Sequence, residues 1–362
     1  MRICFLLGSL GMGGAERTTI YLSEYALQKG WDVDIVTLND KQFYNPPDGA
    51  NYICLDKQLV KKNPIKLIWH ALKRIRKFNQ YARKNRPDIT FCVTYESMPY
   101  ALFAKEKGVL ITSERGNPSN LSSKRKKKLR KFFVKRANGM IFQTNSAKKY
   151  YEDNCKVSGV VIPNAVGNAI AYEFDKPCEK RSKKIVAVGR LVIEKDYPTL
   201  IDAFNLVYKN HRDYKLEIYG GGTQEEYLKE YASQTPASGA ITFMGPQQDA
   251  LRRIYDASCY VLSSVSEGMP NALMEAMAIG LPCVATDCPN GPSDLIIPEY
   301  NGCLVEMKNP WQMAKALERY ITDDSFAKAI AQNAMKIKES NSFENISARF
   351  FEYFQSFLKT DK

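Results

Sequence analysis

Short apolar runs alternate with amphipathic helical patterns along nearly the whole chain, and this alternation constrains the fold more than any other feature. Such a series is typical of parallel sheets whose two faces are covered by helices. Several runs end in glycine, and folds of this kind bind ligands beyond the carboxyl ends of their strands. The predicted strands are RICFLL (2–7), VDIVTL (33–38), ITFCV (89–93), VLITS (109–113), MIFQT (140–144), VVIP (160–163), KIVAVG (184–189), KLEIYG (215–220), ITFMG (241–245), CYVLSS (259–264) and PCVAT (282–286).

The series is interrupted between residues 163 and 184, where periodicity is lost and proline, glycine and charged residues cluster. With 362 residues, the chain is long enough for two domains of ordinary size. We therefore expect an α/β fold of two doubly wound, Rossmann-like domains that face each other across a cleft. The first spans residues 1–165 and the second spans residues 183–340. Residues 341–362 are expected to form a last helix, with aromatic residues at helical spacing.

The composition predicts a cytosolic protein with a basic first half. No apolar run is long enough to span a bilayer, and the one at the N-terminus is too short for a signal peptide. The nine cysteines are scattered without a CxxC pair, which is typical of reduced thiols. Residues 1–175 hold 30 Lys+Arg and 15 Asp+Glu, a net charge of +15, whereas the rest hold 22 and 24, a net charge of −2. The first half is therefore expected to meet an anionic partner.

The stretch SEGMPNALMEAMAIGLPCVATD (266–287) carries the strongest functional signal. It places Glu267 and Glu275 on either side of a short loop and the start of a predicted helix. A helix start offers unpaired backbone N–H groups to a phosphate or a sugar oxygen. Carboxylates accept hydrogen bonds from sugar hydroxyls. The arrangement therefore suits a sugar nucleotide, although Glu275 taken alone fits an exposed helix face equally well.

Two cations follow a predicted strand further upstream, in IVAVGRLVIEKD (185–196). Arg190 can hold a diphosphate as a planar fork and Lys195 as a point charge. Taken alone, the two residues would more often form a solvated surface pair. Their place after a strand that ends in glycine favours a ligand.

These stretches together resemble the retaining glycosyltransferases of glycosyltransferase family 4, which have the GT-B fold. The resemblance rests on GMGGAER (11–17), GRLVIEKD (189–196), EGMPNALMEA (267–276) and TDCPNGPSDLI (286–296), in the order that the family has them. It implies that the second domain binds a nucleotide-sugar donor and the first an acceptor. It also implies that the last helix packs back on the first domain.

The resemblance assigns roles to individual residues. Arg190, Lys195 and Glu267 are expected to be catalytic, because the two cations neutralise the charge that builds on the leaving nucleotide. Glu275 is expected at the ribose of the nucleotide and Glu267 at the hydroxyls of the transferred sugar. No divalent metal and no other cofactor is expected, since the cations take over the metal's role. The donor contacts are expected to be Gly14, Arg190, Lys195, Gly222, Glu267, Gly268, Met269, Pro270, Asn271, Ala272 and Glu275.

The acceptor is expected to lie against two segments of the first domain. One is the glycine loop, which is not a dinucleotide fingerprint because Glu16 occupies the third glycine position. An alternative interpretation of that loop is a tight turn between a strand and a helix. The other is TSERGNPS (112–119), where many family members carry a histidine and this chain carries none. The expected acceptor contacts are Gly13, Glu16, Glu114, Arg115 and Asn117.

A basic segment, SSKRKKKLRKFFVKRAN (122–138), holds nine Lys+Arg and no acidic residue, and residues 61–86 are similar. One interpretation is a solvated helix face. Another is a helix that lies on an anionic membrane surface. Nucleic acid is the competing anion, but the chain contains no recognised nucleic-acid motif. We expect membrane contact, with no nucleic acid bound, through Lys126, Lys127, Arg130, Phe132 and Phe133.

The sequence Asp32-Val33-Asp34 spells a DxD, which holds a metal in other glycosyltransferases. Because it lies within a predicted strand, we interpret it as a strand whose polar residues point outward.

The predicted function is transfer of a sugar, with retention, from a UDP-activated hexose or N-acetylhexosamine to a polyprenyl-diphosphate saccharide. The reaction would take place on the cytoplasmic face of the membrane, in the assembly of a surface polysaccharide or glycan. Two alternatives stay open at this stage. A nucleotide-sugar epimerase of similar fold would explain the motifs, and a non-enzymatic protein that binds membrane or nucleic acid would explain the charge.

Overall fold

The computed structural model describes residues 1–11, 13–57, 64–121, 123–167 and 173–358. The chain divides into two compact units: unit 1 contains residues 1–165 and the C-terminal residues from 343 onward, and unit 2 contains residues 166–342. Some predicted features lie partly outside the described residues. They are Met12 of the glycine loop, residues 61–63 and Ser122 of the basic stretches, residues 168–172 of the linker and residues 359–362 of the last helix.

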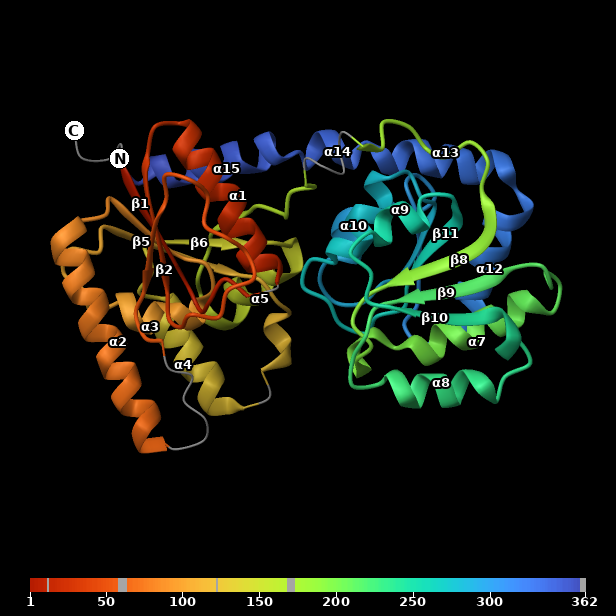
Figure 1. Ribbon diagram of the computed structural model, residues 1–362, viewed down its shortest axis with the longest axis horizontal. Helices are drawn as coiled ribbons and strands as arrows, with labels where there is room; N and C mark the ends of the chain where they lie inside the picture. Colours follow the sequence, from red (N-terminus) through yellow and green to blue (C-terminus); the bar gives the residue numbers. More distant parts are fainter. Residues whose placement is uncertain (12, 58–63, 122, 168–172, 359–362) are drawn as a thin grey trace. The chain divides into compact units, whose positions relative to one another are not determined.

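Unit 1 is built on a seven-stranded sheet of order β3-β2-β1-β4-β5-β6-β7 (Figure 1). Every neighbouring pair is parallel, as the strand–helix alternation predicts. Its strands are β1 (Arg2–Leu7), β2 (Asp32–Thr37), β3 (Asn51–Cys54), β4 (Ile89–Cys92), β5 (Val109–Glu114), β6 (Gly139–Phe142) and β7 (Val160–Val161).

Helices cover both faces of this sheet, so successive residues of a strand are buried in two separate layers. Phe5 of β1 packs in the cluster that includes residues of α1 and α15, whereas Cys4 and Leu6 pack in the cluster that includes residues of α2 and α3. The helices of unit 1 are α1 (Gly14–Gln28), α2 (Pro64–Asn85), α3 (Met98–Ala101), α4 (Lys124–Val134), α5 (Asn145–Cys155) and α15 (Phe343–Ser356), with short 3-10 turns η1 (Tyr95–Ser97) and η2 (Pro118–Asn120).

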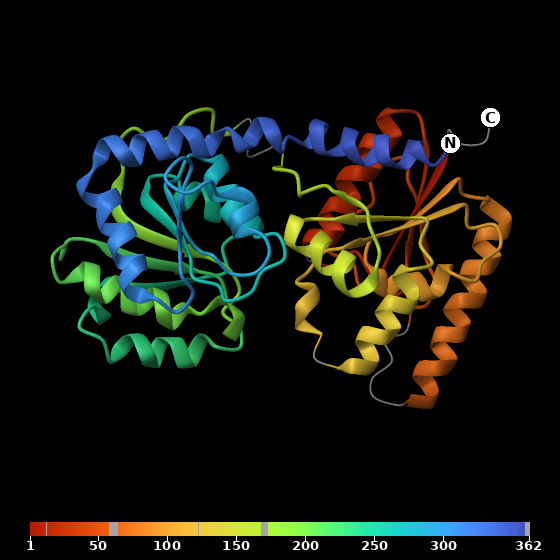
Figure 2. The same ribbon diagram turned by 180° about the vertical axis from the view of Figure 1, so that it is seen from behind.

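Helix α15 belongs to unit 1, although it is the last helix of the chain (Figure 2). Its side chains Phe350 and Phe354 are buried in the same layer as Phe91 of β4, and Phe351 packs edge-to-face on Trp31. The Tyr353 hydroxyl accepts a hydrogen bond from the backbone N–H of Met140, the second residue of β6, at 3.1 Å. The aromatic spacing predicted from the sequence is thus the spacing of a buried helix face.

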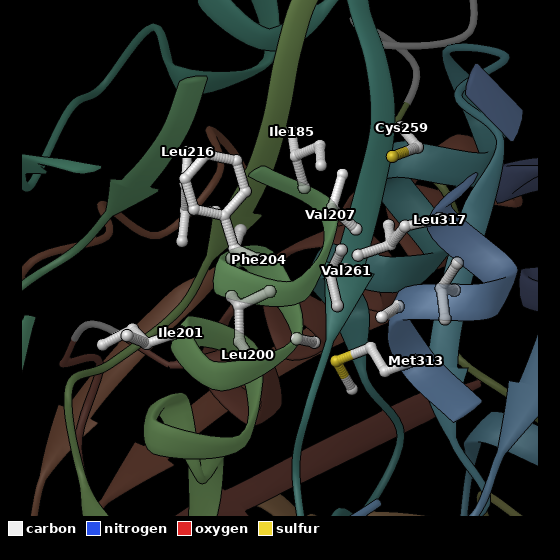
Figure 3. Packing of buried hydrophobic residues seen from close by; sticks show 14 of the residues in the cluster. Ile185, Leu200, Ile201, Phe204, Val207, Leu216, Cys259, Val261, Met313 and Leu317 are labelled. Carbon is white, nitrogen blue, oxygen red and sulfur yellow. The ribbon is translucent and has the colours of Figure 1, made fainter. Parts of the chain in front are cut away.

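Unit 2 is built on a six-stranded sheet of order β10-β9-β8-β11-β12-β13, and its neighbouring strands are also parallel. Ile185 and Ala187 of β8 pack on one face and Val186 on the other. Figure 3 shows the first of these layers, where Phe204 and Leu317 meet Val261 of the sheet. The strands are β8 (Ser182–Val188), β9 (Lys215–Tyr219), β10 (Ile241–Gly245), β11 (Ala257–Leu262), β12 (Cys283–Thr286) and β13 (Cys303–Val305).

The helices of unit 2 connect these strands and form both outer layers. They are α7 (Tyr197–Tyr208), α8 (Glu225–Ser233), α9 (Ala250–Ile254), α10 (Asn271–Ala278), α11 (Pro292–Leu295), α12 (Pro310–Thr322), α13 (Asp324–Met335) and α14 (Ile337–Ser340), with 3-10 turns η3 (Ile193–Lys195) and η4 (Ser238–Ala240). Across the described part of the chain, no helix is both long enough and apolar enough to cross a bilayer.

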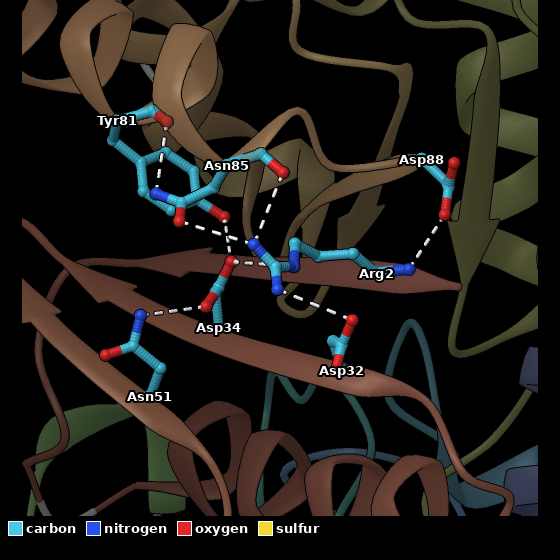
Figure 4. Close-up of polar contacts among 7 residues, drawn as sticks. All are labelled: Arg2, Asp32, Asp34, Asn51, Tyr81, Asn85 and Asp88. Atoms are coloured by element: carbon cyan, nitrogen blue, oxygen red, sulfur yellow. Dashed lines mark hydrogen bonds and ion pairs between the residues drawn. The ribbon is translucent and has the colours of Figure 1, made fainter.

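The prediction that both acidic residues of the DxD point outward is wrong for Asp34. Asp32 is exposed, but Asp34 is buried because β2 is an interior strand covered on both faces. Its carboxylate accepts hydrogen bonds from the Tyr81 hydroxyl at 2.7 Å and the Asn51 amide at 2.9 Å, as Figure 4 shows. Arg2 lies 4.0 Å from the same carboxylate. The DxD is therefore part of the packing between β1, β2, β3 and α2.

Candidate functional site

The loops that follow β8 and β9 in unit 2 are tied together by backbone hydrogen bonds. Leu191 donates its N–H to the carbonyl of Gly221 at 3.0 Å and accepts from the N–H of Gln224 at 2.9 Å. Both loops lie at the carboxyl edge of the parallel sheet, where ligands of doubly wound folds bind. The predicted donor residues Arg190, Lys195 and Gly222 all belong to these two loops.

Glycine is required at Gly220 and Gly222 by the close approach of these loops. Gly220 has φ +131°, and a Cβ there would lie 1.9 Å from the Gly189 carbonyl oxygen. A Cβ on Gly222 would lie 2.3 Å from the carbonyl oxygen of Leu191. Backbone atoms cannot yield as a flexible side chain can, so the missing side chains let the two loops pack directly on each other.

Lys195 and Glu267 form the central contact of the site. The Lys195 ammonium donates to Glu267 Oε1 at 2.5 Å, and the Ser264 hydroxyl donates to the same oxygen at 2.6 Å. Both side chains of the ion pair are largely buried, at 18% and 10% exposure. Because both hydrogen bonds end on Oε1, the second carboxylate oxygen can accept a hydroxyl of a ligand.

A second set of bonds fixes the backbone on both sides of this contact. The Ser263 hydroxyl donates to the Lys195 carbonyl at 2.7 Å, and the Val265 N–H donates to the Glu194 carbonyl at 2.9 Å. The Thr286 hydroxyl at the end of β12 donates to the Ser264 carbonyl at 2.5 Å. The loops after β8, β11 and β12 are therefore held as one rigid group around Glu267.

The Glu267 carboxylate affects the pKa of several buried groups, among them Cys288 and Tyr197. Burial raises the pKa of the Cys288 thiol to about 12, and the negative charge of Glu267 adds to this shift while Lys195 opposes it. Burial and Glu267 also raise the pKa of Tyr197 well above its usual value. Both groups therefore stay neutral near neutral pH.

The sequence interpretation did not single out Ser264, Tyr197 or Cys288. A signal existed for Ser264, since it stands three residues before Glu267, at the spacing of a local side-chain hydrogen bond. Tyr197 and Cys288 lie far from Glu267 in sequence, and only the packing of the strand ends brings them near it.

The loop from Gly268 to Pro270 leads into helix α10. The N-cap position is Pro270, which supplies no side-chain hydrogen bond in the described structure. The first N–H groups of an α-helix have no partner within the helix itself, so the start of α10 is a place where an anionic group can bind. The Met269 side chain of this loop is buried. A Cβ on Gly291 would lie 2.5 Å from the Gly268 carbonyl, so the loop after β12 covers this segment closely.

The remaining predicted donor residues differ in exposure. Glu275 is half-buried on α10, between Met274 and Ala276, which are fully buried. Arg190 is exposed. Gly14 begins α1 in unit 1.

The glycine loop of unit 1 leads directly into α1. Gly13 is the N-cap in an extended conformation, with φ −169°, and its carbonyl accepts from the Arg17 N–H at 3.1 Å. A Cβ at Gly13 would meet the end of the Glu16 side chain, so that carboxylate folds back over the start of the helix. An acidic group in the first turn stabilises the helix dipole.

Arg115 lies just after β5 in a polar network of unit 1. Its guanidinium donates to Ser113 at 3.2 Å, to Thr18 of α1 at 3.3 Å and to Asn164 at 3.1 Å. Its Nη2 is buried and has no hydrogen-bond partner among the described residues. Burial lowers the pKa of Arg115 to about 10, and the nearby Glu16 carboxylate opposes this shift. The group therefore remains a cation at neutral pH.

Glu114 and Asn117, the other predicted acceptor residues, make local contacts. The Glu114 carboxylate is buried and accepts from the Tyr151 hydroxyl at 2.5 Å and from the Gly116 N–H at 3.0 Å. The Asn117 side chain caps η2 by accepting from the Ser119 N–H at 2.9 Å.

The prediction that Arg130 faces the membrane is wrong. Its side chain is 2% exposed and lies 3.9 Å from Glu114. It donates to the Pro118 carbonyl at 2.9 Å and to the Tyr150 hydroxyl at 2.8 Å. A charge buried this deeply needs a partner, and Glu114 supplies one. Arg130 therefore fixes α4 against the loop after β5.

Three of the other four residues predicted to face the membrane are on the outer side of α4. Lys126 and Lys127 are exposed, and so is Phe132. Phe133 is half-buried because it packs against the cluster of β1 and α2.

Comparisons with known proteins agree with this architecture. The sequence model of Glycosyltransferase Family 4 matches residues 12–167, and that of Glycosyl transferases group 1 matches residues 170–337. A relative from Campylobacter jejuni is 26% identical over 343 residues, which is 92% of each chain. It is named as an α-1,4-N-acetyl-D-galactosaminyltransferase acting on GalNAc-α-(1→4)-GalNAc-α-(1→3)-diNAcBac-PP-undecaprenol.

Solved structures show the same fold at lower identity. The lipopolysaccharide outer core galactosyltransferase WaaB is 21% identical, with a TM-score of 0.79 over 98% of this chain and 99% of that one. An Anabaena protein, HepE, solved in complex with UDP and glucose, is 17% identical, with a TM-score of 0.78 over 98% and 100%. Because the two family models together match nearly the whole chain, it belongs to glycosyltransferase family 4 and is a retaining glycosyltransferase of the GT-B fold.

Proposed function

We propose that this glycosyltransferase moves a hexose or N-acetylhexosamine from a UDP-activated donor to a polyprenyl-diphosphate-linked saccharide. The observation that carries the proposal is the convergence of Lys195 and Ser264 on Glu267 at the carboxyl edge of the unit 2 sheet. This group combines an acceptor for sugar hydroxyls, a cation for phosphate and the start of α10. These are the three kinds of contact that a nucleotide sugar requires.

Unit 2 would hold the donor. Arg190 and Lys195 would bind the diphosphate, Glu267 the hydroxyls of the transferred sugar and Glu275 the ribose. The N–H groups at the start of α10 and the backbone of Gly268 would complete the site. The Anabaena neighbour was solved with UDP and glucose, which supports a UDP-sugar here.

The transfer would proceed on one face of the sugar, with retention. The acceptor hydroxyl oxygen forms a bond to the anomeric carbon while the bond from that carbon to the β-phosphate oxygen breaks. The electron pair of the broken bond stays on the departing UDP, and its phosphate oxygen takes the proton of the acceptor hydroxyl. Arg190 and Lys195 would stabilise the charge that develops on this oxygen, so no side chain has to act as the base.

Unit 1 would hold a lipid-linked acceptor. Arg115 offers a buried cation whose Nη2 has no hydrogen-bond partner among the described residues, which suits an anionic group such as a diphosphate. The excess of positive charge in residues 1–175, with Lys126, Lys127 and Phe132 on the outer side of α4, suits an anionic membrane surface. The name of the Campylobacter relative includes undecaprenol, which supports an acceptor of this class. The reaction would then take place on the cytoplasmic face of the membrane, in the assembly of a surface polysaccharide or glycan.

Family membership sets aside the two alternatives raised by the sequence. A nucleotide-sugar epimerase would catalyse a different reaction from the glycosyl transfer for which the two family models are named. A non-enzymatic binding protein would not require the polar group around Glu267.

Thermal unfolding in the presence of UDP- and GDP-sugars, without added metal, tests the donor. A ligand that binds the native state raises the melting temperature. We expect one UDP-sugar to do so, and we expect the shift to disappear in Glu275→Ala. The matched control is Glu230→Ala, which removes an exposed carboxylate from α8 of the same unit and should keep the shift. A shift that occurs only with GDP-sugars, or that survives Glu275→Ala, would contradict the proposed donor site.

A transfer assay then tests the acceptor. The same UDP-sugar should be transferred to a polyprenyl-diphosphate disaccharide and much more slowly to the free disaccharide. Equal rates with both would remove the lipid diphosphate from the proposal.

A further inference from the structure

The first turns of α2 expose a group of large apolar side chains. Leu67, Ile68, Trp69 and Leu72 are 49%, 63%, 58% and 60% exposed. Figure 1 and Figure 2 show why, since the beginning of α2 extends past α4 at one end of unit 1. These four side chains form the projecting tip of α2, and exposing such a group to water is unfavourable unless another surface covers it.

The position of Leu67 shows that the tip is detached from the core. Leu67 precedes His70 by three residues and Arg74 by seven, so all three lie on one face of the helix. His70 is buried on that face, yet Leu67 is half exposed. The helix therefore continues beyond the surface on which its inner face rests, and its tip exposes apolar side chains beside the cation Lys66.

A buried carboxylate fixes α2 just behind the tip. Asp56, which is 2% exposed, accepts a hydrogen bond from the His70 ring nitrogen Nδ1 and another from Lys73 at 3.1 Å. Arg74 lies 3.9 Å from the same carboxylate. Further along the helix, Phe78 and Tyr81 are buried in the core of unit 1. The tip is thus presented by a helix that is anchored over the rest of its length.

Cations follow the tip on the outward side of the helix. Arg76 stands four residues after Leu72 and Arg83 seven residues further, at helical spacing, and both are exposed. The neighbouring Lys77 and Lys84 are exposed as well, and α2 contains no acidic residue. Along the axis, an apolar tip is therefore succeeded by a band of positive charge.

We propose that the tip of α2 inserts into an anionic phospholipid bilayer. From Leu67 to Leu72 the helix rises by about 8 Å, which matches the depth of roughly 5–10 Å to which interfacial helices bury their apolar side chains. Leu67 and Ile68, nearest the start of the helix, would insert deepest, and Trp69 and Leu72 would follow toward the headgroups, where tryptophan is favoured. The cations behind Leu72 would meet lipid phosphates. This deepens the membrane location proposed above, but it rests on α2 and not on the sugar chemistry.

Other occupants fit the tip less well. A second copy of the chain packed symmetrically on this surface would bring two bands of positive charge together. Nucleic acid would pair with the cations but would leave the apolar side chains in water. A bilayer with anionic headgroups satisfies both parts of the surface.

Co-sedimentation with vesicles of phosphatidylcholine containing about one third phosphatidylglycerol tests the proposal. The variant carries Ile68→Ser, Trp69→Ser and Leu72→Ser together, and its control is Trp311→Ser, which removes a tryptophan that is 71% exposed in unit 2. We expect the triple variant to lose vesicle affinity by roughly ten- to a hundredfold. The control should bind as the parent protein does. Since all four positions are exposed, melting temperatures should stay unchanged.

Fluorescence provides an independent measurement in the protein with Trp311→Phe, which keeps Trp69 and the buried Trp31. Vesicles should shift the emission to shorter wavelength, and brominated lipid should quench it. Adding Trp69→Phe should abolish both effects.

Several results would overturn the proposal. They are unchanged vesicle binding by the triple variant, an equal loss in the Trp311→Ser control, and a concentration-dependent dimer that the triple variant abolishes. The proposal would also be overturned if the protein bound a single-stranded oligonucleotide in preference to vesicles and the triple variant lost that binding. The UDP-sugar shift in melting temperature separates this outcome from failure of the proposed function, because the triple variant should retain it in full.

Discussion

Lys195 and Glu267 are 72 residues apart in sequence, yet the ammonium of one lies 2.5 Å from the carboxylate of the other. The loops after β8 and β11 bring them together, because these two strands are neighbours at the centre of the unit 2 sheet. In this arrangement the Lys195 ammonium and the Glu267 carboxylate neutralise each other's charge. A diphosphate that binds Lys195 would therefore compete with Glu267 for the ammonium, and the carboxylate would then be held by Ser264.

Lys195→Ala should lower kcat/KM for transfer by about a hundredfold or more, because a cation at the leaving phosphate stabilises the transition state more than the ground state. Steady-state kinetics with the UDP-sugar identified by thermal shift would measure the loss. Lys229→Ala is the matched control, since Lys229 pairs with Glu225 on an exposed surface of the same unit. Equal losses in both variants would show that the effect is not specific to the site.

Ser264→Ala should cause a smaller loss of roughly tenfold, which is the effect of one hydrogen bond to a charged group. Ser264→Thr keeps the hydroxyl and should restore most of the activity. If Ser264 serves to hold Glu267 while Lys195 binds phosphate, the double variant with Lys195→Ala should lose less than the product of the two single losses. A strictly multiplicative loss would mean that the two residues act independently.

Gly222→Ala should destabilise unit 2 by about 1–3 kcal/mol and raise the KM for the donor, because the new Cβ would lie 2.3 Å from the Leu191 carbonyl oxygen and would push the two loops apart. Gly239→Ala is a sharp control, since a Cβ there meets no atom within 4 Å. Urea unfolding and donor kinetics of the two variants would be compared. Equal free energies of unfolding for Gly222→Ala and Gly239→Ala would show that the two loops can move apart without destabilising unit 2.

The sequence predicted every interior strand of both sheets, and also the edge strands β7 and β10. The eleven apolar runs correspond to strands of the two sheets, whereas β3 and β13 were not predicted. Both are edge strands, and β13 has only three residues. No residue of β3 is fully buried, and the three residues of β13 are too few to show an alternating pattern, so neither strand was recognisable in the sequence.

Charge patterns predicted burial poorly. Arg130 belongs to a run of nine basic residues, and nothing in that run distinguishes the one that is buried. Its partners Glu114 and Tyr150 come from other elements, so only the tertiary fold identifies it. The tip of α2 is the converse case. Helical periodicity places Leu67 on the inner face, but it does not show that the core ends before that turn.

The buried carboxyl of Glu114 should make the stability of unit 1 depend on pH. Burial raises its pKa above the ordinary value of 4.5, so the folded state binds more protons than the unfolded state between 4.5 and the folded pKa. The free energy of unfolding should therefore fall as pH rises through this interval. Urea unfolding at a series of pH values would show this slope, and Glu114→Gln should reduce it.

Arg130 opposes that rise in the pKa of Glu114, so Arg130→Gln should extend the slope to higher pH. It should also destabilise unit 1 by about 3–5 kcal/mol, since a buried carboxylate loses its partner. Lys127→Gln, which alters an exposed cation of the same helix, should leave both stability and slope unchanged. If the dependence of the unfolding free energy on pH is unchanged in Glu114→Gln, another titratable group causes it.

Substitution of Arg115 tests whether this residue binds the acceptor or serves only to hold the structure together. Its guanidinium spans α1, the end of β5 and Asn164, but its buried Nη2 has no hydrogen-bond partner among the described residues. A buried N–H without a partner is unfavourable, but the buried Nε of the structural Arg130 has no partner among the described residues either, so kinetics must distinguish the two roles of Arg115. If the donor is kept for an anionic group of the acceptor, Arg115→Lys should preserve the charge and lose the planar fork. We expect the KM for the polyprenyl-diphosphate acceptor to rise about tenfold or more, while the KM for the UDP-sugar and the melting temperature change little. An equal rise in both KM values, or a large fall in melting temperature, would instead make Arg115 a part of the framework that holds α1 against β5.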